Sequence, residues 1–235
     1  MHSPHFIAAP EALHPSLWLA SQLARSSTRC IDTGFAALSK QLPGGGWPGG
    51  TLIDLLVQQA GIGELRLLAP ALAALPSLPV VLLQPPHSPQ ILALAGLGLA
   101  PSRLVWLRSS NSGDALWAAE QVLRSGSCGA LLFWQSHVRN DALRRLHLAA
   151  QGDDTLFCML RPLAAAQDAS PAPLRLSLRP APGGLEIGFV KRRGPQRDAP
   201  LFLPLTPSSV LQRHASLDRP SPAPAPARSV LPALV

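Results

Sequence analysis

Residues 58–65 lie where a glycine-rich loop could bind the phosphates of a nucleotide. A working loop reads G-x-x-x-x-G-K-[ST]: its backbone N–H groups surround the phosphates, its lysine reaches the β and γ phosphates, and its hydroxyl binds Mg²⁺. Here Gly61 and Gly63 are present, but Gln58 stands at the first glycine, Glu64 at the lysine and Leu65 at the hydroxyl. Because a carboxylate would repel a triphosphate, the sequence predicts a loop of phosphate-binding layout that binds no nucleotide.

Apolar runs of strand length alternate with segments of helical spacing along most of the chain. The strand-length runs are 52–57, 79–84, 104–107, 130–134 and 156–160. Helical spacing is seen at Ala115, Ala118, Ala119 and Val122, and again at Leu143, Leu146 and Ala150 after Asn140 and Asp141, which are residue types that cap helices. This alternation is typical of a parallel sheet covered by helices.

The later part of the chain follows a different pattern. Residues 174–178 and 185–190 alternate apolar and polar positions around the turn Pro182-Gly183-Gly184, which predicts an antiparallel hairpin. A further strand over 201–205 is expected to close the edge of the sheet. The sequence therefore predicts an α/β fold: a mostly parallel twisted sheet flanked by helices, with an antiparallel C-terminal hairpin.

The serial order of these motifs resembles the RecA-like recombinase core. The resemblance is carried by T-G-F-x-x-L from Thr33, P-G-G-G-W-P-x-G from Pro43, the strand and altered loop that follow, and the order of elements over 97–134. It covers roughly residues 17–205. In this altered form the chain is similar to the ImuA family, RecA-related accessory proteins of bacterial mutagenic translesion synthesis that are also grouped with SulA-type cell-division inhibitors.

The resemblance implies two further positions at which an ATPase would carry acids. The strand of the Walker B motif should end in a carboxylate that organises Mg²⁺, but this chain has Trp134 and Gln135 there. A glutamate should orient the attacking water after another strand, where this chain has Pro86 and His87. We therefore predict a protein that is not an enzyme, with no catalytic residue, cofactor or metal.

The charge of the chain favours an acidic partner. The net charge is +7, and arginine outnumbers lysine eighteen to two. The sharpest basic cluster is Lys191, Arg192 and Arg193 with Arg197, directly after the predicted hairpin. It could contact DNA phosphates, with weak and non-specific binding, or an acidic protein surface. A solvated hairpin end, and arginine enrichment from a GC-rich genome, are the alternatives.

Other candidate chemistry is weak in this sequence. His87 has no carboxylate beside it, and Ser136 with His137 lacks a glycine elbow and an acid. The cysteines at 30, 128 and 158 share no C-x-x-C spacing, which indicates buried thiols rather than a disulfide or zinc framework.

Three segments are predicted: an N-terminal arm and helix over 1–30, with the helix at 16–25, a RecA-like domain with degenerate Walker motifs over 31–205, and a Pro/Ala-rich disordered tail over 206–235. The longest apolar run, 67–83, contains Pro70, Pro76 and Pro79, which predicts a helix, a turn and a strand instead of a membrane span. No signal peptide is expected at the N-terminus, and a cytoplasmic location, at the nucleoid when recruited, is predicted.

Three hypotheses of function follow. The resemblance implies an inactive accessory protein of the SOS response whose partners are RecA and an ImuB-like Y-family polymerase homologue, and through it an error-prone DNA polymerase. The first alternative is a SulA-type inhibitor of cell division that binds FtsZ. The second is an unorthodox nucleotide-binding ATPase that uses Arg66 in place of the missing lysine.

Overall fold

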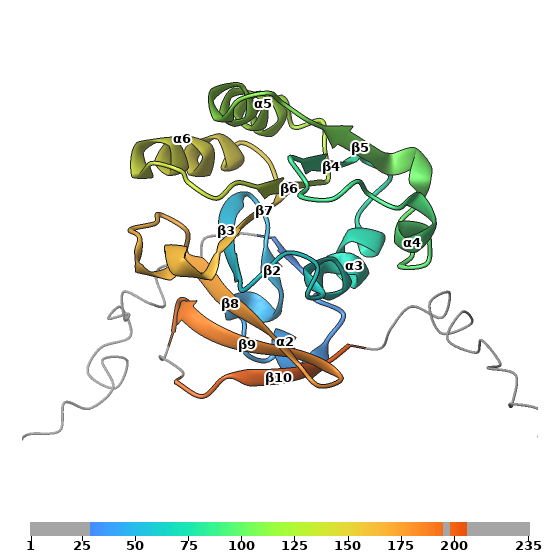
Figure 1. Ribbon diagram of the computed structural model, residues 1–235, viewed down its shortest axis with the longest axis vertical. Helices are drawn as coiled ribbons and strands as arrows, with labels where there is room; N and C mark the ends of the chain where they lie inside the picture. The colour runs from blue at the N-terminus through green and yellow to red at the C-terminus, as the bar shows by residue number, and fades with distance from the viewer. Residues whose placement is uncertain (1–28, 195–197, 206–235) are drawn as a thin grey trace, which may run out of the picture.

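An eight-stranded sheet forms the centre of the molecule in the computed structural model, which describes residues 29–194 and 198–205 (Figure 1). The strand order is β10-β9-β8-β3-β7-β6-β4-β5. The strands are β3 (Thr51–Val57), β4 (Val80–Leu83), β5 (Leu104–Leu107), β6 (Ala130–Trp134), β7 (Leu156–Pro162), β8 (Leu174–Ala181), β9 (Gly184–Lys191) and β10 (Leu201–Pro204). All neighbours from β8 to β5 are parallel, whereas β9 and β10 are antiparallel. The predicted mostly parallel sheet with its antiparallel hairpin is confirmed.

The predicted helix at 16–25, the basic residue Arg197 and the tail over 206–235 lie outside the described residues. A small ribbon precedes the main sheet, in which β1 (Cys30–Ile31) pairs with β2 (Trp47–Pro48). Two short turns of helix lie between these strands, α2 (Ala36–Ser39) and the 3₁₀ turn η2 (Pro43–Gly45).

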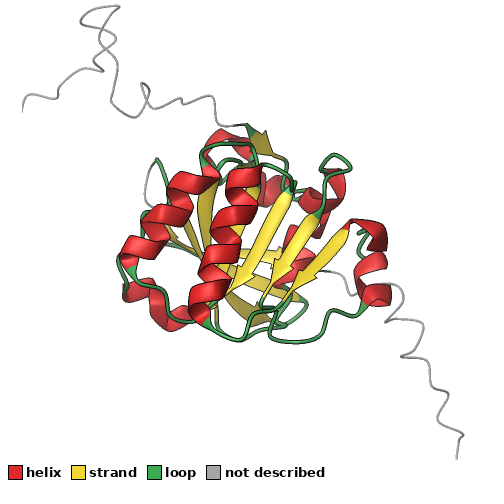
Figure 2. Cartoon of the chain, turned by 90° about the horizontal axis from the view of Figure 1, so that it is seen from above, coloured by secondary structure: helices red, strands yellow, loops and turns green. Residues whose placement is uncertain are grey.

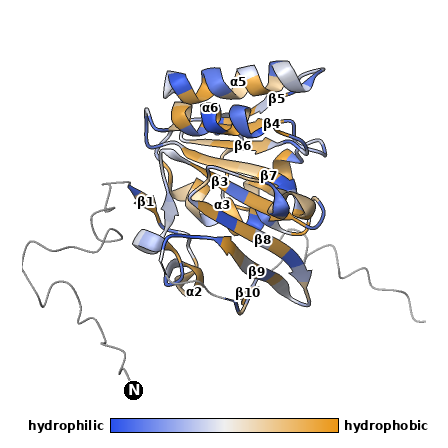
Figure 3. Ribbon diagram, turned by 90° about the vertical axis from the view of Figure 1, so that its left-hand side faces the viewer, coloured by the Kyte–Doolittle hydropathy of each residue, from blue (hydrophilic) through white to orange (hydrophobic). Residues whose placement is uncertain are grey.

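Helices cover both faces of the parallel part of the sheet (Figure 2). On one face α3 (Glu64–Ala74) and α4 (Ile91–Ala95), followed by the 3₁₀ turn η3 (Pro101–Arg103), enclose one apolar core; on the other, α5 (Ser112–Ser125) and α6 (Asn140–Ala150) enclose a second. A third 3₁₀ turn, η4 (Leu163–Gln167), follows β7. The hydropathy view shows β6 as mainly hydrophobic, while β8 and β9 carry bands of both kinds (Figure 3). Central parallel strands are buried on both faces, which explains why they are continuous apolar runs in the sequence.

The glycine of the T-G-F motif is required by its close packing against α3. The backbone of Gly34 has φ +77°, and a Cβ atom there would lie 2.2 Å from the Cβ of Pro70 on α3. Glycine alone meets both demands, because it has no Cβ and adopts positive φ readily. Pro70 lies inside α3. This helix ends at Ala74 and β4 begins at Val80, so the predicted division of the apolar run into helix, turn and strand is confirmed.

One expected helix cap is wrong. Helix α6 begins at Asn140 after the N-cap residue Arg139, and no side chain caps it. The neighbouring helix α5 is capped instead: the side-chain oxygen of Asn111 accepts a hydrogen bond from the N–H of Asp114 at 2.8 Å. Within the described ranges, no helix is long and apolar enough to cross a bilayer.

Candidate functional site

The altered phosphate loop leaves β3 and enters α3, which is the path that such a loop follows in a nucleotide-binding protein. The two glycines supply the required backbone, since Gly61 has φ +85° and Gly63, the N-cap of α3, has φ +123°. The Glu64 carboxylate is buried, with 4% of the residue exposed. Its Oε1 accepts the N–H of Gly61 at 2.8 Å and its Oε2 the N–H of Gly63 at 3.1 Å.

In this arrangement the Glu64 carboxylate takes the place that a bound anion would occupy in the loop. Backbone N–H groups at the start of a helix are the groups that hold a phosphate, because they are unpaired and lie at the positive end of the helix dipole. Here the N–H of Gly63, the N-cap of α3, and that of Gly61, two residues before it, are already bonded to Glu64. A phosphate would have to displace this carboxylate and then lie next to its negative charge.

The next two residues of α3 are the altered position Leu65 and Arg66, the candidate substitute for the missing lysine. Leu65 is half-buried and packs against the apolar core beneath α3. The guanidinium of Arg66 lies along the loop, with Nη2 at 3.5 Å from the position that a Cβ on Gly63 would occupy. Arg66 therefore lies near the loop backbone, where a substitute for the lysine would be needed. The N–H groups of Gly61 and Gly63, however, are already bonded to Glu64.

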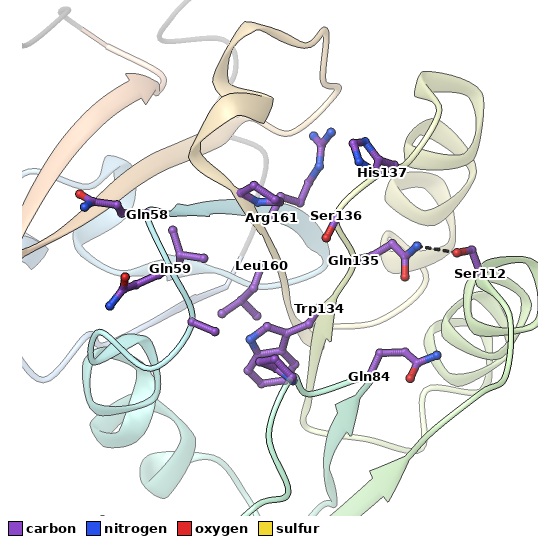
Figure 4. Close-up of a pocket in the computed structure, with 14 residues that line it drawn as sticks. Gln58, Gln59, Gln84, Ser112, Trp134, Gln135, Ser136, His137, Leu160 and Arg161 are labelled. Atoms are coloured by element: carbon purple, nitrogen blue, oxygen red, sulfur yellow. Dashed lines mark hydrogen bonds between the residues drawn. The ribbon is translucent and has the colours of Figure 1, made fainter.

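A pocket of about 520 Å³ opens beside the loop, at the carboxyl ends of β3, β4, β6 and β7 (Figure 4). This is the usual place for a ligand in a parallel sheet. The structure brings Gln58, Trp134, Gln135 and Pro86 together in its lining, although they are far apart in the sequence. His87 is exposed and is not part of the lining.

Two lining residues carry unusual features. Gln84, directly after β4, has φ +55° and is the one non-glycine residue with positive φ in the described part of the chain. Its Nε2 donates to the carbonyl of Ser109 at 2.7 Å. Trp134, at the end of β6, is 9% exposed, and its indole N–H is buried without a hydrogen-bond partner. Figure 4 shows this indole pointing from β6 toward the loop that carries Gln58 and Gln59.

Sequence reasoning missed a buried ionic cluster in the middle of the sheet. Asp54 of β3 accepts hydrogen bonds at its Oδ2 from Arg175 Nε of β8 at 3.0 Å and from Arg161 Nη1 of β7 at 3.4 Å. Arg161 also binds Asp168 at 2.8 Å, and Arg175 donates to three backbone oxygens near η4. The one signal in the sequence was a charged residue inside each apolar strand.

The basic cluster after the hairpin is partly engaged by the fold. The ammonium group of Lys191 donates to the carbonyl of Ser170 at 3.1 Å. Arg192 donates to the carbonyl of Gln41 and lies over the ring of Phe189, with 5.2 Å between the guanidinium carbon and the ring centre. Arg193 is exposed. Contact of this cluster with DNA or a partner stays a prediction.

His147 lies close to the same cluster, at the C-terminal end of α6. Its Nδ1 is 3.3 Å from both Thr51 Oγ1 and the backbone N of Leu52, so it is placed to accept the Leu52 N–H. Burial lowers the pKa of His147 below its usual value, and the positive charges of Lys191 and Arg193 lower it further. The neutral imidazole is the form that fits this position.

The thiols and carboxylates of the described chain form no metal site, since no three His, Cys, Asp or Glu side chains group suitably there. Cys128 and Cys158 are buried as predicted, and burial raises the pKa of Cys128 to about 11. Cys30 is only half-buried, because the small β1–β2 ribbon covers it less than the main sheet covers the others.

Fold and site together define an α/β protein with a mostly parallel sheet, in which a buried carboxylate is bonded to the loop between β3 and α3. No family model matches the chain. Over 84 residues the chain is 32% identical to the cell division inhibitor SulA of Edwardsiella piscicida. The match covers 34% of this chain and 50% of that protein, so the chain spans about half the length of the curated relative it matches.

Proposed function

We propose that the chain is a catalytically inactive RecA-like accessory protein of SOS-induced, error-prone translesion DNA synthesis. It acts through contacts with RecA and with an ImuB-like Y-family polymerase homologue, and through the latter with an error-prone DNA polymerase. The proposal rests on the motif order that resembles the ImuA family. The partial similarity to SulA supports an association with the SOS response.

The observation that carries the inactive part of this proposal is the internal carboxylate of the loop. Glu64 takes the N–H groups of Gly61 and Gly63, and the carboxyl end of β6 offers Trp134 and Gln135 in place of an acid for Mg²⁺. Loss of the lysine, the metal carboxylate and the water-orienting glutamate would each cost orders of magnitude in rate. A protein that keeps this sheet but lacks the catalytic groups is suited to act by binding other proteins at its surface.

A calorimetric titration with MgATP tests the inactive site. We expect no binding at physiological concentration and no hydrolysis above background. A dissociation constant near or below roughly 100 μM, about −5.5 kcal/mol, would contradict the proposal and favour the ATPase that uses Arg66. An Arg66→Ala variant provides the control, since only the ATPase hypothesis requires that side chain.

A test in cells addresses the accessory role. Deleting the gene should abolish damage-induced mutagenesis while leaving growth without damage unchanged, and the tagged protein should co-purify with RecA and the ImuB-like subunit after damage. Unchanged mutagenesis in the deletion strain would overturn the proposal.

A SulA-type inhibitor of cell division is the second candidate, favoured by the partial similarity to SulA. On this hypothesis, the purified protein should block assembly of FtsZ and its overproduction should produce filamentous cells. The accessory protein of the first proposal should do neither. Assembly of FtsZ followed by light scattering, with and without equimolar protein, separates the two.

A further inference from the structure

We propose that the pocket at the carboxyl ends of β3, β4, β6 and β7 binds an extended, uncharged segment of a polypeptide, recognised through its main-chain amides. This inference rests on the proposed function in one respect, that the protein acts by contact with other proteins. It adds the site and the chemistry of the segment, which neither the resemblance nor the similarity to SulA assigns.

In the described part of the chain, the pocket has no buried charged side chain that is available to an ion. Among the described residues that line it, Arg161 and His137 are the ionisable ones, and His137 is exposed to solvent. The guanidinium of Arg161 is fully buried and bonded to Asp54 and Asp168. In the adjacent loop the N–H groups of Gly61 and Gly63 are bonded to Glu64. A ligand that enters this pocket must therefore be recognised by hydrogen bonds and apolar contact, which selects against phosphates and carboxylates.

Amide side chains supply those hydrogen bonds. Four glutamines line the pocket, at positions 58, 59, 84 and 135. The amide of Gln84 is fixed by the Ser109 carbonyl, and that of Gln135 by the hydroxyl of Ser112 at 2.8 Å (Figure 4). In both cases the amide carbonyl accepts no hydrogen bond from the described residues, so it can accept a peptide N–H.

The backbone of Gln84 gives an independent reason to regard this amide as functional. A glutamine at φ +55° is strained, since its Cβ is crowded in the left-handed region that glycine enters freely. Strain of this kind concentrates at ligand sites, where a side chain has to be held in one direction. Glycine would relieve the strain at this position but remove the amide.

The indole of Trp134 supplies the unfilled donor of the pocket. Its N–H is buried and has no partner, although a buried donor without a hydrogen bond is costly. The ring points toward the loop of Gln58 and Gln59, across the pocket (Figure 4). A carbonyl oxygen of a bound segment would satisfy this donor, after a small movement of the loop.

A peptide fits this lining better than a nucleoside does. A nucleobase binds by stacking on an open aromatic face, but 91% of Trp134 is covered. Ribose hydroxyls are held by a carboxylate in dinucleotide-binding folds, and none is found among the described lining residues. Alternating N–H and C=O groups of an extended chain match the glutamine amides and the indole.

The test begins with selection of a displayed library of random 12-residue peptides against the full-length protein. The best peptide is synthesised, and its binding is followed by calorimetry and by the indole N–H resonance of Trp134, assigned with a Trp134→Phe variant. We expect a consensus without charged residues, a shift of that resonance on binding, and no displacement by adenosine or inorganic phosphate.

Two pocket variants and one control separate recognition from folding. Gln84→Gly should weaken binding of the peptide at least tenfold. The melting temperature of this variant should be no lower than that of the wild-type protein, because glycine tolerates the positive φ. Gln135→Ala should weaken it comparably, and Gln167→Ala, on η4 outside the pocket, should not.

Four results would overturn the proposal: no binder that depends on the pocket, a charged consensus, equal affinity for Gln84→Gly, or displacement by adenosine. Failure of the proposed function is seen separately. A peptide that binds the pocket in a protein without effect on mutagenesis would leave this inference in place and remove the translesion role.

Discussion

Two buried carboxylates, Asp54 and Glu64, lie close together in the sequence and are stabilised in opposite ways. Asp54, in the middle of β3, is bonded to arginines of the two strands beside it, β7 and β8. Glu64, at the first turn of α3, is bonded to two N–H groups of its own loop. The first joins segments more than a hundred residues apart, and the second involves only its neighbours.

The contrast shows which part of this molecule is structural and which part could change. The Asp54 cluster fixes three adjacent strands, so its loss affects the whole sheet. The Glu64 contact closes one loop, so its loss should affect that loop and its affinity for anions. Four measurements can break or sharpen this distinction.

The largest effect is expected from Asp54→Asn. The substitution leaves the buried guanidinium of Arg161 with Asp168 alone and that of Arg175 with neutral partners. Breaking a buried pair in this way costs about 3–5 kcal/mol of the free energy of unfolding, measured by urea denaturation. A joint replacement of Asp54, Arg161 and Arg175 by Leu, Met and Met should recover most of the loss. A single variant that loses less than about 1 kcal/mol would show that the cluster contributes little.

A smaller effect is expected from Glu64→Ala. It should lower the free energy of unfolding by about 1–3 kcal/mol, because two N–H groups lose their acceptor and one of them is buried. The variant should then gain a property that the wild-type protein lacks. Millimolar phosphate, at constant ionic strength, should raise its melting temperature, since an anion can replace the missing carboxylate.

The matched control for this rescue is Glu120→Gln, which removes another well-covered carboxylate with no loop around it. Phosphate should not stabilise that variant. If phosphate fails to stabilise Glu64→Ala, the loop does not have the geometry of an anion site, and its likeness to a phosphate loop is one of sequence alone.

Glu120→Gln itself should lower the free energy of unfolding by about 1 kcal/mol or less. Glu120 pairs with Arg145 at 2.6 Å and Arg124 at 2.7 Å, but both arginine side chains are more than 60% exposed. The hydrogen bond from Arg145 lowers the pKa of Glu120. A folded pKa below the unfolded value means that this contribution is present above about pH 4.5 and is lost on acidification. In 0.5 M salt the stability difference between Glu120→Gln and the wild-type protein should disappear, while that of Asp54→Asn should stay unchanged. This result would sharpen the contrast between surface and interior.

The smallest effect is expected from His147→Gln, and it should appear only in acid. The pKa of His147 is lowered in the folded protein, so the unfolded chain binds a proton more readily. Its contribution is therefore complete above the unfolded pKa, about 6.5, and is lost as the pH falls below it. Unfolding in urea at pH 7.5 and pH 5.5 should show a smaller difference for the variant. An identical difference would mean that another group controls the acid response.

The sheet could be predicted from the sequence because its strands are continuous apolar runs separated by helical spacing, a local pattern. The identities at Glu64 and Leu65 predicted a loop unsuited to phosphate. The sequence did not indicate that the Glu64 carboxylate turns back to Gly61 and Gly63, because this depends on the direction of one side chain.

The Asp54 cluster could not be predicted, since its arginines lie 107 and 121 residues away and meet it only through strand order. The same holds for the pocket, whose glutamines come from three separate loops. The missed half-exposure of Cys30 also depends on tertiary coverage, here by the small β1–β2 ribbon.

The central place of β3 has a consequence during synthesis of the chain. This strand leaves the ribosome early, but the strands that flank it, β7 and β8, are made about a hundred residues later. At roughly 5–20 residues per second, Thr51–Val57 waits on the order of ten seconds without a neighbour. A nascent chain stalled before residue 156 therefore exposes Thr51–Val57, in which Asp54 lies among apolar residues, without its neighbouring strands. Such a chain is expected to bind the chaperones at the exit tunnel.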